Sequence, residues 1–183
     1  MSILSDAETR MKGAVEALRR ELGSLRAGRA TPALVERISV DYYGTPTPLR
    51  EVAALNVPEP RQLLIQPWDR SLVGAIEKAI QRSDLGISPS SDGSVIRLTL
   101  PPLTEERRRD LVKTLHRIEE EQKVAVRNCR RDALDSIRGA AKEGHLSEDD
   151  SRRQQEELQR VTDRYIAEIE RLVKEKEQEI LTV

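Results

Sequence analysis

Few residues of this chain could carry out chemistry by themselves. The two histidines, His116 and His145, belong to no group of ligands at metal-binding spacing. The single cysteine, Cys129, falls on the apolar side of a helical pattern, where a small buried side chain is expected. The nine glycines form no G-x-G-x-x-G motif or other phosphate-binding loop. We therefore expect no catalytic residue, no metal site, no cofactor and no enzymatic activity.

Arginines are the remaining candidates. Between residues 123 and 138 there are five Lys or Arg against two Asp, a local charge of +3 in a chain whose net charge is −1. Arginine binds phosphate through paired hydrogen bonds, so these residues could hold an RNA backbone. They recur at spacings of about three, four or seven residues, which places them on one stripe of a helix. These residues are Lys123, Arg127, Arg130, Arg131 and Arg138.

A solvent-exposed helix face with intrahelical ion pairs, such as Arg131 with Asp135, explains the same pattern. Aromatic residues make up only 2% of the chain. This scarcity argues against a platform on which RNA bases stack. RNA recognition would therefore depend on the phosphate backbone and on shape.

These arginines lie on a long predicted helix from Thr104 to Glu143. The segment contains no proline, its first glycine is Gly139, and Gly144 follows it. As one helix of 40 residues it would be about 60 Å long, so other helices must pack along it. Its apolar residues recur at alternating steps of four and three. The positions expected to face inward are Leu111, Leu115, Ile118, Gln122, Ala125, Cys129, Ala133 or Leu134, and Ile137.

Two further helices are predicted at the ends of the chain. A capping box at Ser5–Glu8 starts a helix that runs to about Ala27. A second capping box at Ser147–Asp150 starts a helix that continues to the end of the chain. With the central helix they predict an antiparallel three-helix bundle.

The segment between the first two helices has a different composition. All nine prolines lie between Pro32 and Pro102, so neither helix can continue through it. Its alternating apolar residues predict strands, then a helix capped by Asp69, then a strand. Tyr42 and Tyr43 are expected to contribute to the core of this small α/β domain, and Trp68 is expected either in this core or as an exposed contact. The predicted strands are near 38–42, 52–57, 62–66 and 95–100, with a loop at 44–48 and a turn at 88–93.

The predicted fold class is therefore α+β. Residues 1–29 and 105–183 form the bundle, and residues 30–104 form an inserted domain. Proline is present in both connections, which fits either a hinge of limited range or a rigid corner. The residues assigned to the two connections are Ala30, Thr31, Pro32, Pro101, Pro102, Leu103 and Thr104.

Composition limits where the protein acts. One cysteine allows no intramolecular disulfide and suits a reducing compartment. No apolar run approaches the roughly 20 residues that cross a bilayer, and the N-terminal residues match no targeting segment. We expect a cytoplasmic monomer without membrane contact.

Several long motifs resemble the ribosome recycling factor family. They are R-A-G-R-A-T-P (26–32), V-D-Y-Y-G-T-P-T-P-L (40–49), I-R-L-T-L-P-P-L-T-E-E-R-R-R (96–109) and V-A-V-R-N-C-R-R-D-A (124–133). Together with S-E-D-D (147–150) they extend the resemblance over essentially the whole chain. Trp68 and Cys129 are the two residues that depart from the family pattern.

The resemblance implies an L-shaped molecule, in which a β/α/β sandwich domain is attached by a flexible hinge to the three-helix bundle. It implies a factor that binds 23S ribosomal RNA of the large ribosomal subunit. With elongation factor G and GTP, such a factor splits the post-termination ribosome and releases mRNA and tRNA. The implied RNA-binding residues are Arg127 and Arg130, then Arg108, with Arg26 and Arg29 near the hinge; Arg131 joins them from the stripe.

A function of another class also fits the helical pattern. A coiled-coil adaptor would bind protein partners through its acidic and basic faces and would not contact RNA. Such an adaptor would be indifferent to the loss of Arg127 and Arg130.

Overall fold

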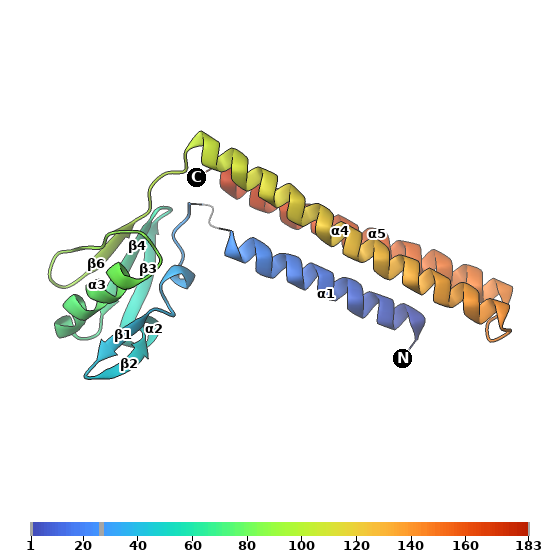
Figure 1. Ribbon diagram of the computed structural model, residues 1–183, viewed down its shortest axis with the longest axis horizontal. Coiled ribbons are helices and arrows are strands. Elements are labelled where there is room, and N and C mark those ends of the chain that lie inside the picture. The colour runs from blue at the N-terminus through green and yellow to red at the C-terminus, as the bar shows by residue number, and fades with distance from the viewer. Residues whose placement is uncertain (1, 26–27, 183) are drawn as a thin grey trace. The chain divides into compact units, whose positions relative to one another are not determined.

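The computed structural model describes residues 2–25 and 28–182 of the chain. It contains two compact units, shown in Figure 1. The first is a bundle of α1 (Ile3–Ser24), α4 (Glu105–Lys142) and α5 (Glu148–Thr182). The second carries the elements between α1 and α4, including two small β-sheets. The α+β class predicted from the sequence is confirmed.

None of the helices in the described part of the chain combines the length and the apolar character needed to cross a bilayer.

The three helices of the bundle lie side by side and are close to straight (Figure 1). Their buried positions recur every 11 residues, as in the series Leu115, Val126 and Ile137 of α4. Ala7 and Leu18 of α1, and Ile169 and Ile180 of α5, show the same interval. An 11-residue repeat corresponds to about 3.67 residues per turn, close to the period of an unstrained helix. Little supercoiling is therefore needed to keep the row of buried side chains on each helix, its seam, facing the other two helices.

This repeat corrects one predicted core position. Alternating steps of three and four place Ala125 on the seam of α4, but Ala125 is only half-buried and Val126 is fully buried. The seam takes two successive steps of four, from Ile118 through Gln122 to Val126, because alternation alone drifts away from the helix period. Gln122 is half-buried, and its amide donates to Glu21 Oε1 of α1 at 3.2 Å.

The ends of the helices are set by identifiable caps. Ser147 accepts a hydrogen bond from the backbone N–H of Asp150 at 3.1 Å, which confirms the predicted start of α5. Gly144 ends α4 with φ +79°, and the bonds from Gly144 and His145 back to Ala141 and Ala140 form a Schellman motif.

The start of the first helix was predicted wrongly. Ser2, and not Ser5, accepts the capping hydrogen bond, which comes from the backbone N–H of Ser5 at 3.1 Å. The helix therefore begins at Ile3. It ends at Ser24, before the predicted end near Ala27, which lies outside the described residues.

The inserted unit contains a separate hairpin of β1 (Ser39–Tyr42) and β2 (Thr45–Pro48). It also contains a four-stranded antiparallel sheet, whose strands in spatial order are β3 (Ala53–Glu59), β4 (Gln62–Pro67), β6 (Ile96–Thr99) and β5 (Ser90–Ser91). Helix α3 (Val73–Arg82) packs Val73, Ile76 and Ile80 into the core, as predicted. Leu72, predicted on the same apolar face, is also buried in this core but belongs to the 3₁₀ turn that precedes α3. Single 3₁₀ turns occur at Pro32–Leu34 and Arg70–Leu72. A short helix, α2 (Leu49–Val52), connects β2 to β3.

Two predicted connections of the inserted unit contain strands. The loop predicted at 44–48 is strand β2, and the turn predicted at 88–93 contains β5. Tyr43 and Gly44, with φ of 49° and 83°, form a two-residue hairpin turn. The pair that closes such a turn, Tyr42 with Thr45, is hydrogen-bonded, and hydrogen-bonded and non-hydrogen-bonded pairs then alternate along the two strands. Pro46 and Pro48 both fall in non-hydrogen-bonded pairs, where the missing N–H of proline is not needed.

The core of the inserted unit is aliphatic. Val40, Leu63, Ile65, Ile76 and Ile96 are among its fully buried residues. Tyr42 and Tyr43, expected in this core, lie outside it with 40% and 76% of their surface exposed. Trp68 is 71% exposed, which agrees with the second of its two expected positions. Branched aliphatic side chains from the sheet and from α3 fill the interior of this small unit.

Candidate nucleic-acid interface

Helix α4 brings three of the predicted RNA-binding residues together. Arg127, Arg130 and Arg131 follow one another within about 6 Å along the helix axis. Their positions are fixed by the buried seam residues Val126 and Cys129, which point the intervening side chains outward. Arg127 and Arg131 are exposed, and Arg130 is half-buried at the border with α5.

Two of these arginines have neutral partners. Arg130 Nη1 lies 3.5 Å from Gln159 Oε1 of α5, and Arg131 Nη2 donates to Asn128 Oδ1 at 3.1 Å. Helical spacing alone suggests Asp135 as the partner of Arg131, and Asn128 takes that place. An amide oxygen orients a guanidinium without neutralising it, so both positive charges stay effective toward a phosphate.

Arg127 is paired with a carboxylate instead. Its Nη1 lies 3.0 Å from Glu120 Oε1, two turns earlier on the same helix, and both side chains are at least half exposed. Exposed pairs of this kind contribute only about 0–1 kcal/mol. A phosphate could therefore replace Glu120 at small cost.

Lys123 does not belong to the accessible stripe. Its Nζ lies 2.8 Å from Glu170 Oε1 of α5 and 3.1 Å from Glu119 Oε1, and its side chain is 17% exposed. The hydrogen bond to Glu170, together with that to Glu119, raises the pKa of Lys123 above its usual value. This lysine links α4 to α5, so its charge is not presented on the outer face with those of Arg127, Arg130 and Arg131.

The other predicted RNA-binding residues are not part of this group. Arg108 lies near the start of α4, about 28 Å from Arg127 along the helix, and donates to the backbone oxygen of Leu181 at 3.0 Å. Arg29 is exposed in the inserted unit. Arg26 lies outside the described residues.

The residues of the two predicted connections differ in how they are held. Ala30 is buried, and its N–H donates to the backbone oxygen of Pro60 at 2.7 Å. Thr31 and the 3₁₀ turn that begins at Pro32 follow directly. Pro101, Pro102 and Thr104 are exposed, whereas Leu103 is half-buried.

The two connections also touch each other within the inserted unit. Gly28 has φ +75°, and a Cβ added there would lie 2.9 Å from Leu103 Cγ. The close approach and the left-handed backbone both require glycine at this position. That the connections act as a hinge stays a prediction.

The cysteine and the histidines, for which the sequence predicts no catalytic or metal-binding role, are the last residues to be placed. Cys129 is buried on the seam of α4, as its place in the pattern predicted. His116 is exposed and lies 3.4 Å from Glu119 and 3.8 Å from Glu177. Within residues 2–25 and 28–182, no group of three or more His, Cys, Asp and Glu could hold a metal ion.

The immediate partners of the arginines were not predicted from the sequence. Glu120 stands seven residues before Arg127, a two-turn spacing that could have indicated the pair. Gln159 comes from another helix, and no local pattern points to it. The exposure of Tyr43 was not predicted either, because an aromatic residue beside a strand is more often buried.

Comparison with known proteins decides the family. The model of the family described as ribosome recycling factor matches residues 18–181. The chain belongs to the ribosome recycling factor family. Ribosome-recycling factor of Brevibacillus brevis is 57% identical over 182 residues, covering 100% of this chain and 98% of the relative. That of Thermomicrobium roseum is 56% identical over 181 residues, covering 99% and 98%.

Two solved structures of the ribosome recycling factor family resemble this chain over its whole length. A solution structure of the ribosome recycling factor is 49% identical, with a TM-score of 0.76, covering 99% of this chain and 96% of the other. A second is 46% identical with a TM-score of 0.63, covering 99% and 100%. It comes from models of the T. thermophilus ribosome recycling factor and the E. coli elongation factor G bound to the E. coli post-termination complex.

Proposed function

We propose that this chain acts in the cytoplasm as a ribosome recycling factor. It binds the post-termination ribosome on the large subunit and, with elongation factor G and GTP, promotes splitting into subunits and release of mRNA and tRNA. The observation that carries this proposal is the whole-chain likeness to a relative bound with elongation factor G to a post-termination complex. The family match over residues 18–181 supports it.

The exposed arginines of α4 are the proposed anchor on 23S ribosomal RNA. Arg127, Arg130 and Arg131 present three guanidinium groups within about one turn of a straight helix, two of them with neutral partners. Guanidinium groups bind phosphate oxygens in pairs, so a spaced row of them fits a phosphate backbone. Arg108, Arg29 and Arg26 would extend the contact beyond this group.

In this account the chain hydrolyses nothing itself and uses no cofactor. Elongation factor G supplies the energy of GTP hydrolysis, and the recycling factor transmits force. The buried 11-residue seams make the bundle stiff along its length, which suits a lever. The connections at 30–32 and 101–104 would act as the hinge that limits the direction in which the inserted unit moves.

Stiffness of the second connection has a testable consequence. In a Pro101→Gly/Pro102→Gly variant, we expect large-subunit binding within about twofold of wild type but several-fold slower subunit splitting, because glycine frees the φ angles that proline fixes. Splitting is followed by light scattering after mixing with elongation factor G and GTP. Pro58→Gly, an exposed change in β3 of the same unit, is the control. An unchanged splitting rate in the double variant would refute the hinge.

The carboxylate beside Arg127 should compete with RNA. We expect Glu120→Gln to raise the affinity for isolated large subunits by up to about fivefold, since the exposed ion pair it removes is worth about 0.2–1 kcal/mol. Glu121→Gln is the matched control, because Glu121 is the next residue and pairs with Arg117 at 2.7 Å. Equal gains in both variants would show that net charge, and not release of Arg127, sets the affinity.

The direct test of the function is subunit splitting itself. The full chain is added to post-termination ribosomes with elongation factor G and GTP, and the decrease in light scattering is recorded. We expect splitting that requires all three components. Ribosomes that stay intact, with the chain bound to other protein partners, would favour the adaptor function.

A further inference from the structure

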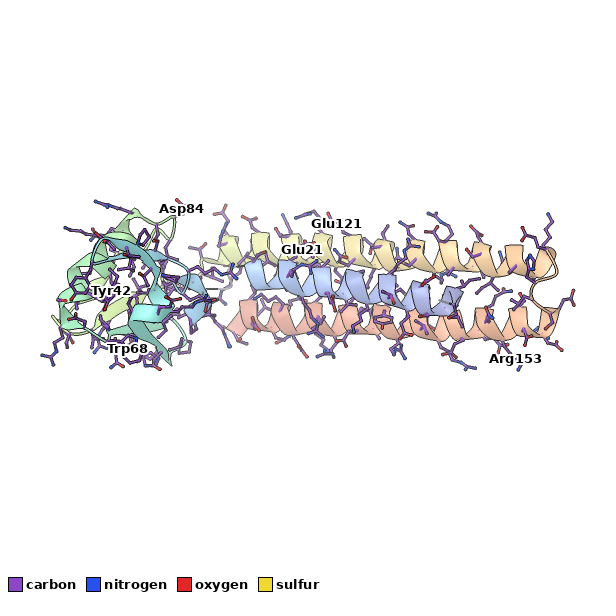
Figure 2. The ribbon with its side chains drawn as sticks, turned by 90° about the horizontal axis from the view of Figure 1, so that it is seen from below. Glu21, Tyr42, Trp68, Asp84, Glu121 and Arg153 are labelled. Atoms are coloured by element: carbon purple, nitrogen blue, oxygen red, sulfur yellow. The ribbon has the colours of Figure 1, made fainter. Side chains whose placement is uncertain are left out.

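The inserted unit carries an exposed aromatic groove that the RNA contact of α4 does not use. The groove has a volume of about 360 Å³. Tyr42 and Trp68, labelled in Figure 2, form its aromatic sides, and Val52 and Leu72 are buried at its base. Trp68 is 71% exposed, which is unusual for the largest apolar side chain of a small unit. Exposed tryptophan and tyrosine beside a pocket are typical of binding sites.

The aromatic side chains are held in place although they are exposed. The backbone N–H of Trp68 donates to the oxygen of Val52 at 3.0 Å. Tyr43 packs edge-on against Tyr42 with ring centroids 4.8 Å apart, and its hydroxyl donates to Asp69 Oδ2 at 3.1 Å. The groove is therefore preorganised, so little conformational freedom is lost when a ligand enters.

The charge of the groove selects the kind of ligand. Two carboxylates, Glu51 and Asp69, line it, and no Lys or Arg of the described residues does. Hydrogen bonds from Ser71 and Tyr43 hold the pKa of Asp69 below its usual value, so this carboxylate is ionised at neutral pH. Oδ1 accepts from the backbone N–H of Ser71 at 2.9 Å and Oδ2 from the hydroxyl of Tyr43 at 3.1 Å, so the carboxylate is held in a fixed orientation at the groove.

Aromatic faces next to carboxylates favour a cation. A guanidinium can stack on an indole or phenol ring while it donates to a carboxylate, and arginine does both better than lysine. A phosphate would meet two negative charges, which argues against RNA in this groove. We propose that the groove of Tyr42, Glu51, Trp68 and Asp69 binds an arginine side chain presented by a basic segment of a protein partner.

Trp68 provides the measurement, because it is the only tryptophan of the chain. The full chain is titrated with acetyl-Gly-Arg-Gly-Arg-Gly-amide while its fluorescence is recorded. A second peptide replaces both arginines by citrulline, which keeps the shape and removes the charge. We expect a saturable change with the arginine peptide and about tenfold weaker binding of the citrulline peptide.

A substitution tests the carboxylate side of the groove. We expect Glu51→Gln to lower the affinity for the arginine peptide about three- to tenfold. Glu59→Gln is the control, since Glu59 is an exposed carboxylate of the same unit that does not line the groove. Glu51 is exposed, so neither change should disturb folding.

Three results would overturn this proposal. The first is no saturable change up to about 10 mM arginine peptide, the limit of weak specific binding. The second is a citrulline peptide that binds as tightly as the arginine peptide, or a Glu51→Gln variant that binds the arginine peptide as tightly as wild type. The third is a response to a uridine hexanucleotide stronger than that to the peptide, which would assign the groove to RNA. None of these results depends on α4 binding ribosomal RNA.

Discussion

An Arg127→Ala/Arg130→Ala variant is expected to bind isolated large ribosomal subunits about 100-fold more weakly than wild type, a decrease of about 2.8 kcal/mol in binding free energy. Hydrogen bonds to charged groups contribute about 1.5–3 kcal/mol each. The expected decrease is smaller than two full phosphate bonds would give, because Arg127 must first leave Glu120. Arg130 gives up a neutral partner, the amide oxygen of Gln159 at 3.5 Å, so it should account for the larger part.

The control for this variant removes the same charge from another helix. Arg153 and Arg160 of α5 are 74% and 73% exposed and pair with Asp150 and Glu157; Figure 2 labels Arg153. We expect Arg153→Ala/Arg160→Ala to change the affinity by less than about threefold. Similar decreases in both double variants would mean that overall charge, not the α4 group, determines binding.

The second large effect concerns the stability of the bundle. Val126 is fully buried and Val124 is 41% exposed, although they stand two residues apart on α4. We expect Val126→Ala to lower the free energy of unfolding by about 2 kcal/mol, through reduced apolar burial and the cavity left behind. Val124→Ala should change it by less than about 0.5 kcal/mol, with a small gain from the higher helix propensity of alanine.

Urea unfolding followed by far-UV circular dichroism measures this difference. The two variants remove the same atoms from the same helix, so propensity effects cancel when they are compared. A comparable decrease of stability in both would contradict the 11-residue seam that places Val126, and not Ala125, in the core.

Much of the bundle could be predicted because its signals are local. The caps at Ser147 and Gly144, and the buried positions from Leu111 to Ile118, follow from short-range spacing and capping chemistry. The seam near Ala125 could not be predicted by alternating steps, because a small error in the period grows along 38 residues of helix. The cap at Ser2 was not predicted, because Ser5–Glu8 matches the capping-box sequence and Ser2 does not.

The inserted unit was less predictable, because its pairing is not local. Prolines suggested a loop at 44–48, yet a hairpin accepts Pro46 and Pro48 in pairs that need no N–H. Alternation suggested that Tyr42 faces the core, but at 40% exposure it lies at the groove instead. Such outcomes depend on which strand lies opposite, and sequence spacing does not contain that information.

The candidate RNA-binding site was also predictable in part from the sequence. The positions of Arg127, Arg130 and Arg131 on one face follow from helical spacing alone. That Lys123 is held between Glu119 and Glu170, and that Arg130 lies beside Gln159, depends on the packing of α5. Sequence spacing therefore identifies the cations, and tertiary structure decides which of them are available to RNA.

The most direct test of the RNA anchor is the salt dependence of binding to isolated large subunits, for wild type and Arg127→Ala/Arg130→Ala. Removing one arginine–phosphate pair should reduce the magnitude of the slope of log affinity against log salt by roughly 0.7 to 0.9. We predict a slope shallower by about 1.4 to 1.8 in the double variant, with its helical content unchanged. An identical slope would contradict the anchor on α4, and absence of wild-type binding would contradict the recycling function in favour of an adaptor.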